Sequence, residues 1–401
     1  MVIFGSAWLM AAGLYALHLS LVLIYPTTAI IRVVSWIVVP FVLTVLMYLG
    51  GYPLFALSPR RLAQITEGWL ERRLKIAFLA WAGLTAVEIV YSGGIPIVWL
   101  FQGTGQSYVD FGIPSFHGLL NSLLLTIGLS GFTLFAVTGR KRHLWMPGFV
   151  IAWSIIAVTR NMLIVILMEC IIVWAMIRRV TWRKIAKGLV PLLVLVLVFG
   201  YVGDMRTGID RFRQLADPSP NYPDWLPSGV LWIYIYVSTP INNLVNTVRT
   251  TAPLNSALFP NTTALLVPTV LREVIYNPAT ISNAVSGELV DEGSWNVSTA
   301  YVGAFQDFGT LGIACFSLVL GAVAAHFWRD HSLRGSLVYA VVGQCLAISV
   351  FFNHLFYLPV ISQVVWLYLL VPKFERVDRR GQRSEALTGN PVSNQGGLYN
   401  A

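Results

Sequence analysis

Long apolar runs follow one another along most of the chain, separated by short polar stretches. A membrane-spanning helix needs about 20 apolar residues, or about 17 at the short end, so the pattern predicts a series of spanning helices. The first run lacks a basic leader and is too long for the core of a signal peptide, so we expect an uncleaved helix. The expected single helices lie near residues 2–24, 28–50, 76–92, 113–138, 186–203, 299–326, 336–353 and 356–371.

Clusters of basic residues lie beside these apolar runs. Positively charged loops of membrane proteins remain in the cytoplasm, so the clusters indicate which loops face inward and place the N-terminus inside. The clusters are SPRRLAQITEGWLERRLK, GRKRH, IRRVTWRKIAK, WRDHSLR and PKFERVDRRGQR.

Arg160 interrupts an apolar run that lies between two of these cytoplasmic clusters. The run must therefore cross the membrane an even number of times. From Leu144 to Ile177 it has 34 residues, enough for two short helices of about 16 residues that meet at Thr159, Arg160 and Asn161. Arg160 then belongs to an external turn. The last two helices repeat this arrangement, with an external turn at Asn353 and His354.

Residues 204–298 form one long external segment, rich in Pro, Asn, Asp and Trp. Within it, 229–248 is apolar, but Pro240 and three Asn favour a re-entrant or interfacial segment over a simple span. The prediction is an all-α polytopic membrane protein with about 10 to 12 spanning helices in one bundle. Residues 1–381 form a single transmembrane domain, and 382–401 form a disordered cytoplasmic tail.

Composition agrees with this fold class. The chain is 56% hydrophobic and 11% charged, whereas a soluble domain carries about a quarter charged residues. The net charge of +9 comes mainly from the loop clusters, so it indicates topology, and no nucleic-acid partner is expected. Cys170, Cys315 and Cys345 lie inside apolar runs, which predicts neither a disulfide framework nor a metal site.

The two predicted membrane faces differ in the kind of basic residue they carry. All five lysines fall on the cytoplasmic side. A guanidinium matches phosphate with a rigid fork of donors, which an ammonium lacks, so arginines near one face suit a phosphate-bearing lipid headgroup. The external basic residues are Arg32, Arg160, Arg206, Arg211, Arg213, Arg249 and Arg272.

Each of these arginines also has a structural interpretation. Arg211 and Arg213 suit the membrane interface or a carboxylate partner, and Arg206 has Asp204 as a nearby partner. Arg160 has no acidic residue one turn away, and ionisable groups inside a membrane are by default functional.

Other ionisable residues are predicted to lie at the same external membrane face as these arginines. Glu88 ends the third predicted helix, Asp110 and His117 flank the start of the fourth, and His354 lies in the last turn. A histidine there serves either in proton transfer or in packing, and Glu88 serves a site or pairs with an arginine. No DxD pair, P-loop, GxSxG elbow or HExxH motif is present, so metal-dependent and hydrolytic enzymes are unsupported, and no cofactor is expected.

Several fragments, in their order along the chain, resemble the Wzy-type polymerases of oligosaccharide repeat units, which include O-antigen polymerases. They are VTRNM, YIYVSTPINNLVN, LVPTVLREV and STAYVGAFQDFGTLG. The related O-antigen ligases carry an H-N-x-Y motif, of which this chain keeps Tyr301, Asp307, Gly309 and Gly312. It has Ser298 and Thr299 in place of the histidine and asparagine, which favours polymerase over ligase.

The resemblance implies a GT-C-like glycosyltransferase in the bacterial inner membrane with a periplasmic site. The reaction transfers a glycan from undecaprenyl pyrophosphate to a second lipid-linked repeat unit, with membrane lipid and a chain-length regulator as further partners. The implied pyrophosphate ligands are Arg160, Arg206, Arg249 and Arg272. The implied catalytic residues are His354 as base, with Glu88 and Asp307 as orienting groups. Glu88 or His117 as the base, or leaving-group stabilisation without a base, are the alternatives. The sugar-binding candidates are Tyr301, His117, Trp232 and Tyr236, although single aromatics also suit an interfacial belt.

Two rival functions stay open. A flippase of the same lipid-linked unit would bind pyrophosphate without chemistry, but it should show paired broken helices and inverted repeats, and the sequence has no clear repeat. A ligase would use lipid A core as acceptor. For Gly309 and Gly312, close helix packing is an alternative to any part in a site.

Overall fold

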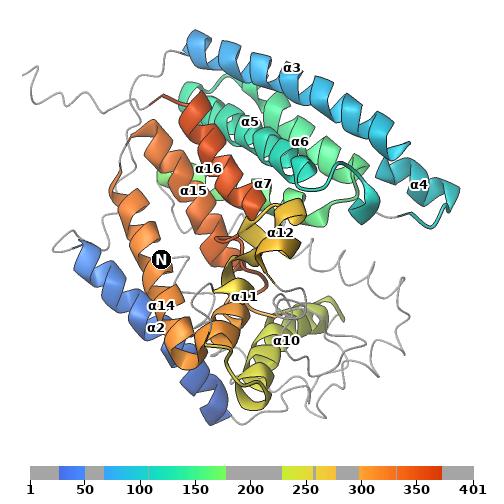
Figure 1. Cartoon of the computed structure of the whole chain (residues 1–401). Helices are drawn as coiled ribbons and strands as arrows, with labels where there is room; N and C mark the ends of the chain where they lie inside the picture. The colour runs from blue at the N-terminus through green and yellow to red at the C-terminus, as the bar shows by residue number, and fades with distance from the viewer. Residues whose placement is uncertain are drawn as a thin grey trace, which may run out of the picture.

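The computed structural model describes residues 27–49, 67–106, 108–177, 228–255, 259–276, 298–330 and 332–372, and these residues contain helices and no strands (Figure 1). The longer helices are α2 (Thr27–Leu49), α3 (Glu67–Ser92), α5 (Phe116–Thr138), α6 (Trp145–Ile156), α7 (Arg160–Ile177), α10 (Ser228–Thr250), α14 (Val302–Arg329), α15 (Leu333–Ile348) and α16 (Leu358–Leu370). The short helices are α4 (Pro96–Gln102), η1 (Tyr108–Asp110), η2 (Lys141–Leu144), α11 (Pro260–Thr263), η3 (Ala264–Leu266) and α12 (Thr269–Ile275).

Within the described residues, four helical stretches are long and apolar enough to cross a membrane: Thr28–Tyr48, Gly68–Gln102, Phe116–Thr138 and Val302–Arg329. α7, α15 and α16 are shorter but also apolar. The outer faces of these helices expose more large apolar side chains than water-soluble proteins usually do. Examples are Ile31, Leu43, Met47, Leu79, Val87, Val90, Ile164, Ile171, Leu311 and Leu318. The described residues therefore form an all-helical fold with four candidate membrane-spanning helices.

α5 lies at the centre of one group of helices and contacts α3, α6, α7 and α16, while α2 packs along α14 (Figure 1). Two glycines explain how closely α6 approaches α5. A Cβ atom at Gly128 would lie 2.5 Å from Cγ2 of Val150, and one at Gly131 would lie 2.6 Å from Cβ of Met146. Small residues of this kind let membrane helices pack closely without a hydrophobic driving force between them.

The two ends of the bundle differ in character. At one end, which we call the basic end, Glu71 pairs with Lys75 at 2.8 Å and with Arg142 at 3.0 Å, and Arg329 donates to the Tyr48 carbonyl at 3.0 Å. At the other end, which we call the loop-rich end, α3, α6 and α15 finish and α5, α7, α14 and α16 begin. There α11 packs against α14 and η3 packs against α16, and α12 follows η3 along the chain (Figure 1).

The hairpin expected around Arg160 is confirmed, because α6 and α7 are two short helices joined by residues 157–159. α3 begins at Glu67, nine residues before its expected start, because the ion pairs of Glu71 allow the helix to continue through a charged turn. The stretch expected to be re-entrant lies in α10, an uninterrupted helix that contains Pro240. The helices expected at 2–24 and 186–203 and the tail 382–401 lie outside the described residues, so a bundle of 10 to 12 spans stays a prediction.

Candidate functional site at the loop-rich end

α14 is broken near its start, at Phe308 and Gly309. Gly309 has a φ of 62° and a ψ of −142°, a conformation that glycine adopts without the steric cost of a Cβ atom. The break frees backbone carbonyls from the helix, and the segment after α10 uses them. The N–H of Leu254 donates to the carbonyl of Gln306, and that of Asn255 donates to the carbonyl of Asp307, both at 2.8 Å. The carbonyls of Gln306 and Asp307, which the break frees, therefore both have hydrogen-bond partners.

Asp307 lies in this broken segment, is completely buried, and accepts four hydrogen bonds. Oδ1 accepts from the backbone N–H and the side-chain amide of Asn261, each at 3.0 Å. Oδ2 accepts from the backbone N–H of Thr262 at 2.9 Å and from its hydroxyl at 2.6 Å. Each carboxylate oxygen thus has two donors, so Asp307 holds α11 against α14 and has no lone pair directed at a substrate. The geometry gives it a structural role in place of the predicted orienting role.

A small hollow lies beside this junction. Asn353 closes one side, because its Nδ2 donates to the Thr262 carbonyl at 3.2 Å and its Oδ1 accepts from the N–H of Phe356 at 3.1 Å. Gly303 is required on another side, since a Cβ there would lie 2.5 Å from the carbonyl oxygen of Asn261. The walls are uncharged and are formed by Asn261, Leu265, Thr299, Ala300, Gly303, Phe352 and Asn353.

His354 follows this wall in the turn between α15 and α16 and is buried. The side-chain amide of Gln344 donates to its Nδ1 at 2.7 Å, so the ring proton of the neutral histidine lies on Nε2. Burial lowers the pKa of His354 to about 4. At neutral pH the ring is therefore uncharged and presents an N–H. The sequence predicts a base at His354, whereas this arrangement offers a hydrogen-bond donor.

Tyr357 lies next to His354 and within electrostatic range of Arg272. The ring of Tyr357 stacks on His354 with centroids 5.9 Å apart and an interplanar angle of 24°. Burial raises the pKa of Tyr357, and the positive charge of Arg272 opposes this rise. The guanidinium of Arg272 donates from Nε to the Ala264 carbonyl at 2.9 Å and from Nη2 to the Val267 carbonyl at 3.3 Å. Two of its five N–H groups hold it in place, and the other three are not used in these bonds.

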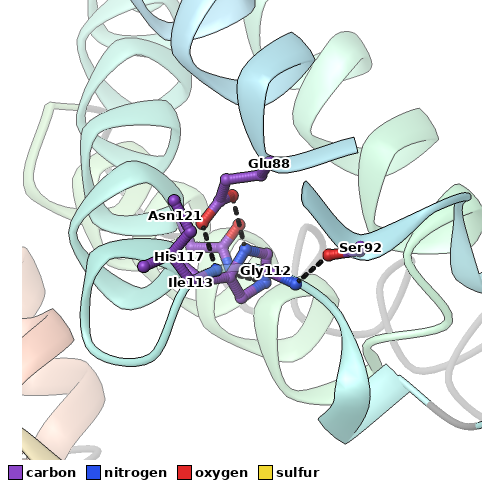
Figure 2. Close-up of polar contacts among 6 residues, drawn as sticks. All are labelled: Glu88, Ser92, Gly112, Ile113, His117 and Asn121. Atoms are coloured by element: carbon purple, nitrogen blue, oxygen red, sulfur yellow. Dashed lines mark hydrogen bonds and ion pairs between the residues drawn. The ribbon is translucent and has the colours of Figure 1, made fainter. Parts of the chain in front are cut away.

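Glu88 and His117, which the sequence places at the same level, are in direct contact (Figure 2). Nδ1 of His117 donates to Oε2 of Glu88 at 2.9 Å, and Nε2 accepts from the amide of Asn121 at 2.8 Å. Oε1 of Glu88 accepts from the N–H of Ile113 at 3.1 Å. Both ring nitrogens of His117 are therefore occupied. These residues, together with Ser92 and Gly112, form what we call the Glu88 cluster.

The Glu88 cluster fixes the loop before α5 and, through it, the helix that carries Arg272. Ser92 accepts from the N–H of Gly112 at 2.8 Å, which ties the loop to the end of α3. Further along the same loop, the hydroxyl of Ser115 accepts a 2.7 Å hydrogen bond from the N–H of Thr269. Thr269 is the first residue of α12. The geometry therefore gives Glu88 and His117 a positioning role.

The remaining predicted site residues lie in different places. Arg160 is the first residue of α7, at the loop-rich end, but its side chain lies outside the description. Arg249 is in the last turn of α10 and is exposed. Tyr301 is only 7% exposed and packs edge-on against Phe316 at 5.5 Å, so it contributes to the core and presents no surface for a sugar. Trp232 and Tyr236 belong to α10, with side chains that are not described, and Arg206 lies outside the described residues.

Four residues that build this end are not predicted from the sequence. Gln344, Asn261 and Thr262 are polar residues with no motif around them, and their partners lie 10 to 46 positions away. Tyr357 had a usable signal, since it lies three residues after His354, at the start of the next predicted helix.

Within the described part of the chain, no three His, Cys, Asp or Glu side chains come together as metal ligands. No family model, curated protein or solved structure matches the chain. Its function must therefore be inferred from its own residues and their geometry.

Proposed function

We propose that the chain is a metal-independent glycosyltransferase of the bacterial inner membrane. It would polymerise oligosaccharide repeat units linked to undecaprenyl pyrophosphate, at the periplasmic face. The observation that best supports this proposal is the position of Arg272. Two backbone carbonyls hold its guanidinium near Tyr357, whose ring stacks on His354, at the end of the bundle where α7 begins with Arg160.

In the proposed glycosyl transfer, the protein's main task is to stabilise the leaving pyrophosphate. The bond between the anomeric carbon and the pyrophosphate oxygen breaks, the acceptor hydroxyl oxygen bonds to that carbon, and the hydroxyl proton passes to the released pyrophosphate. Negative charge therefore grows on phosphate oxygens. Donors that are already fixed in place stabilise such charge without reorganisation. The N–H groups of Arg272 that do not bind the Ala264 and Val267 carbonyls, and the Nε2–H of His354, are donors of this kind.

The test is a reaction with purified protein and lipid-linked repeat units as the only glycan substrate. Polymerisation produces a ladder of longer lipid-linked glycans together with free undecaprenyl pyrophosphate. Absence of both products, with protein that remains folded and substrate that a known polymerase elongates, removes the proposal. Release of product only when lipid A core is supplied would instead identify a ligase.

A flippase is the second candidate, because α14 is a broken helix, as are substrate-binding helices of many transporters. The break lies at the seventh and eighth residues of α14, near the loop-rich end and away from the middle of the helix. This position favours a site at one membrane face over a site for alternating access. Translocation of a labelled lipid-linked unit across proteoliposomes, without elongation, would support the flippase.

A further inference from the structure

Glu169 and Gln363 meet in the interior of the bundle, between the loop-rich end and the basic end. Glu169 is the tenth residue of α7 and Gln363 lies midway along α16, and both are completely buried. Nε2 of Gln363 donates to Oε2 of Glu169 at 2.9 Å. The other oxygen of each group, Oε1 of Glu169 and Oε1 of Gln363, has no hydrogen-bond partner in the described part of the chain.

Among the residues that the structure describes, no cation lies near Glu169 to pair with its ionised form. α5, α6 and α16 contain no lysine or arginine, and the arginine of α15, Arg334, stacks on Tyr368 near the basic end. On α7 itself, Arg160 is nine residues away, which is about 13 Å along a helix. The titratable groups that neighbour Glu169 are the thiols of Cys170 and Cys345, and neither supplies positive charge. A buried carboxylate without a counter-charge is strongly disfavoured.

We propose that Glu169 is a proton-binding site inside the bundle, where its neutral carboxylic acid forms a closed pair of hydrogen bonds with the amide of Gln363. In such a pair the amide N–H donates to one carboxyl oxygen and the acid O–H donates to the amide oxygen. One proton thus satisfies both of the oxygens that otherwise lack a partner. Exchanging the amide nitrogen and oxygen of Gln363 changes nothing, because either orientation needs one proton on the carboxyl group.

The pair joins two helices that lead to the loop-rich end. α7 begins at Arg160, and α16 follows the turn that contains His354 and Tyr357. The hydroxyl of Thr126 on α5 also approaches the backbone carbonyl of Gln363, at 3.4 Å. Loss of the proton would place an unpaired charge between α7 and α16, so the proton is part of what holds these helices together. This inference is independent of the reaction proposed above.

Infrared spectroscopy of the full-length protein in detergent tests the proposal directly. We expect the wild type at pH 7 to show the carbonyl band of a protonated carboxylic acid in apolar surroundings, and Glu169→Gln to lack it. Glu169→Gln should keep the unfolding temperature of the wild type within a few degrees, since a second amide closes the same pair of hydrogen bonds. Identical spectra for the two proteins, or a large loss of stability in Glu169→Gln, would overturn the proposal.

A double-mutant cycle provides a second, independent measurement. Glu169→Leu and Gln363→Leu each leave one buried polar group without its partner, so each should lower the unfolding temperature. The double variant removes both polar groups and should be more stable than the sum of the single effects predicts. Additive losses would mean that the two side chains do not act as a pair, which contradicts the closed arrangement.

Discussion

Thr262 donates two hydrogen bonds to the carboxylate of Asp307, one from its backbone N–H at 2.9 Å and one from its hydroxyl at 2.6 Å. Asn261 supplies two more. Because the break in α14 places Asp307 opposite the start of α11, these bonds join two segments that are distant in the sequence. Asp307 therefore contributes by holding the backbone at the start of α11 in place.

Asp307→Asn should lower stability more than it changes chemistry. An amide has one acceptor oxygen, and its NH₂ group would face donors, so at least one buried N–H or O–H would lose its partner. Each such group costs about 1–3 kcal/mol. We expect a clear fall in the unfolding temperature in detergent, with a smaller fall for Thr262→Val, which loses only the hydroxyl bond. A stable Asp307→Asn protein without polymerase activity would instead show that Asp307 takes part in the reaction.

Arg272→Lys should abolish most polymerisation while the protein stays folded. Lysine keeps the charge but lacks the planar fork, so it cannot bind two backbone carbonyls and a diphosphate at once. The measurement is the rate of undecaprenyl pyrophosphate release. Arg329→Lys is a matched control, since Arg329 also donates to a backbone carbonyl but lies at the basic end. Near-normal turnover in Arg272→Lys, or an equal loss in both variants, would contradict the assignment.

The sequence predicts the helical hairpin at Arg160 because basic clusters on both sides require an even number of crossings. It also places Glu88, His117 and His354 at one level, because helix ends can be located from apolar runs. It does not predict that Asp307 bonds to Thr262, since these residues are 45 positions apart and their contact depends on the break at Gly309. Nor does it predict the donor role of His354, which is determined by Gln344, a buried amide with no motif around it.

His354 should make stability depend on pH in the acidic range. Its pKa is about 4 in the folded protein and about 6.5 in an unfolded chain, so the unfolded state binds more protons between these values. The contribution of neutral His354 is complete above pH 6.5 and is lost as pH falls toward 4. The wild type should therefore lose more thermal stability than His354→Gln over this interval.

The neutral donor form of His354 also predicts how turnover depends on pH. If His354 acts as a donor in its neutral form, its titration does not reduce turnover between pH 7 and about 5. A base with a pKa near its ordinary value would reduce turnover throughout that interval. A rate that falls tenfold per pH unit below pH 6.5 in the wild type, but not in His354→Gln, would restore the base role.

Ser115→Ala tests whether the Glu88 cluster acts by positioning Arg272. The substitution removes the acceptor for the Thr269 N–H at the start of α12, while Glu88, His117 and Asn121 keep their own bonds. Because α12 then loses one of its anchors, the guanidinium of Arg272 should be less well fixed, and misplacement of a catalytic group is costly to rate. We expect a several-fold lower turnover with an unchanged unfolding temperature. Ser122→Ala is the control, since its hydroxyl bonds only within α5, to the Leu119 carbonyl, and equal effects of the two substitutions would exclude a positioning role for this contact.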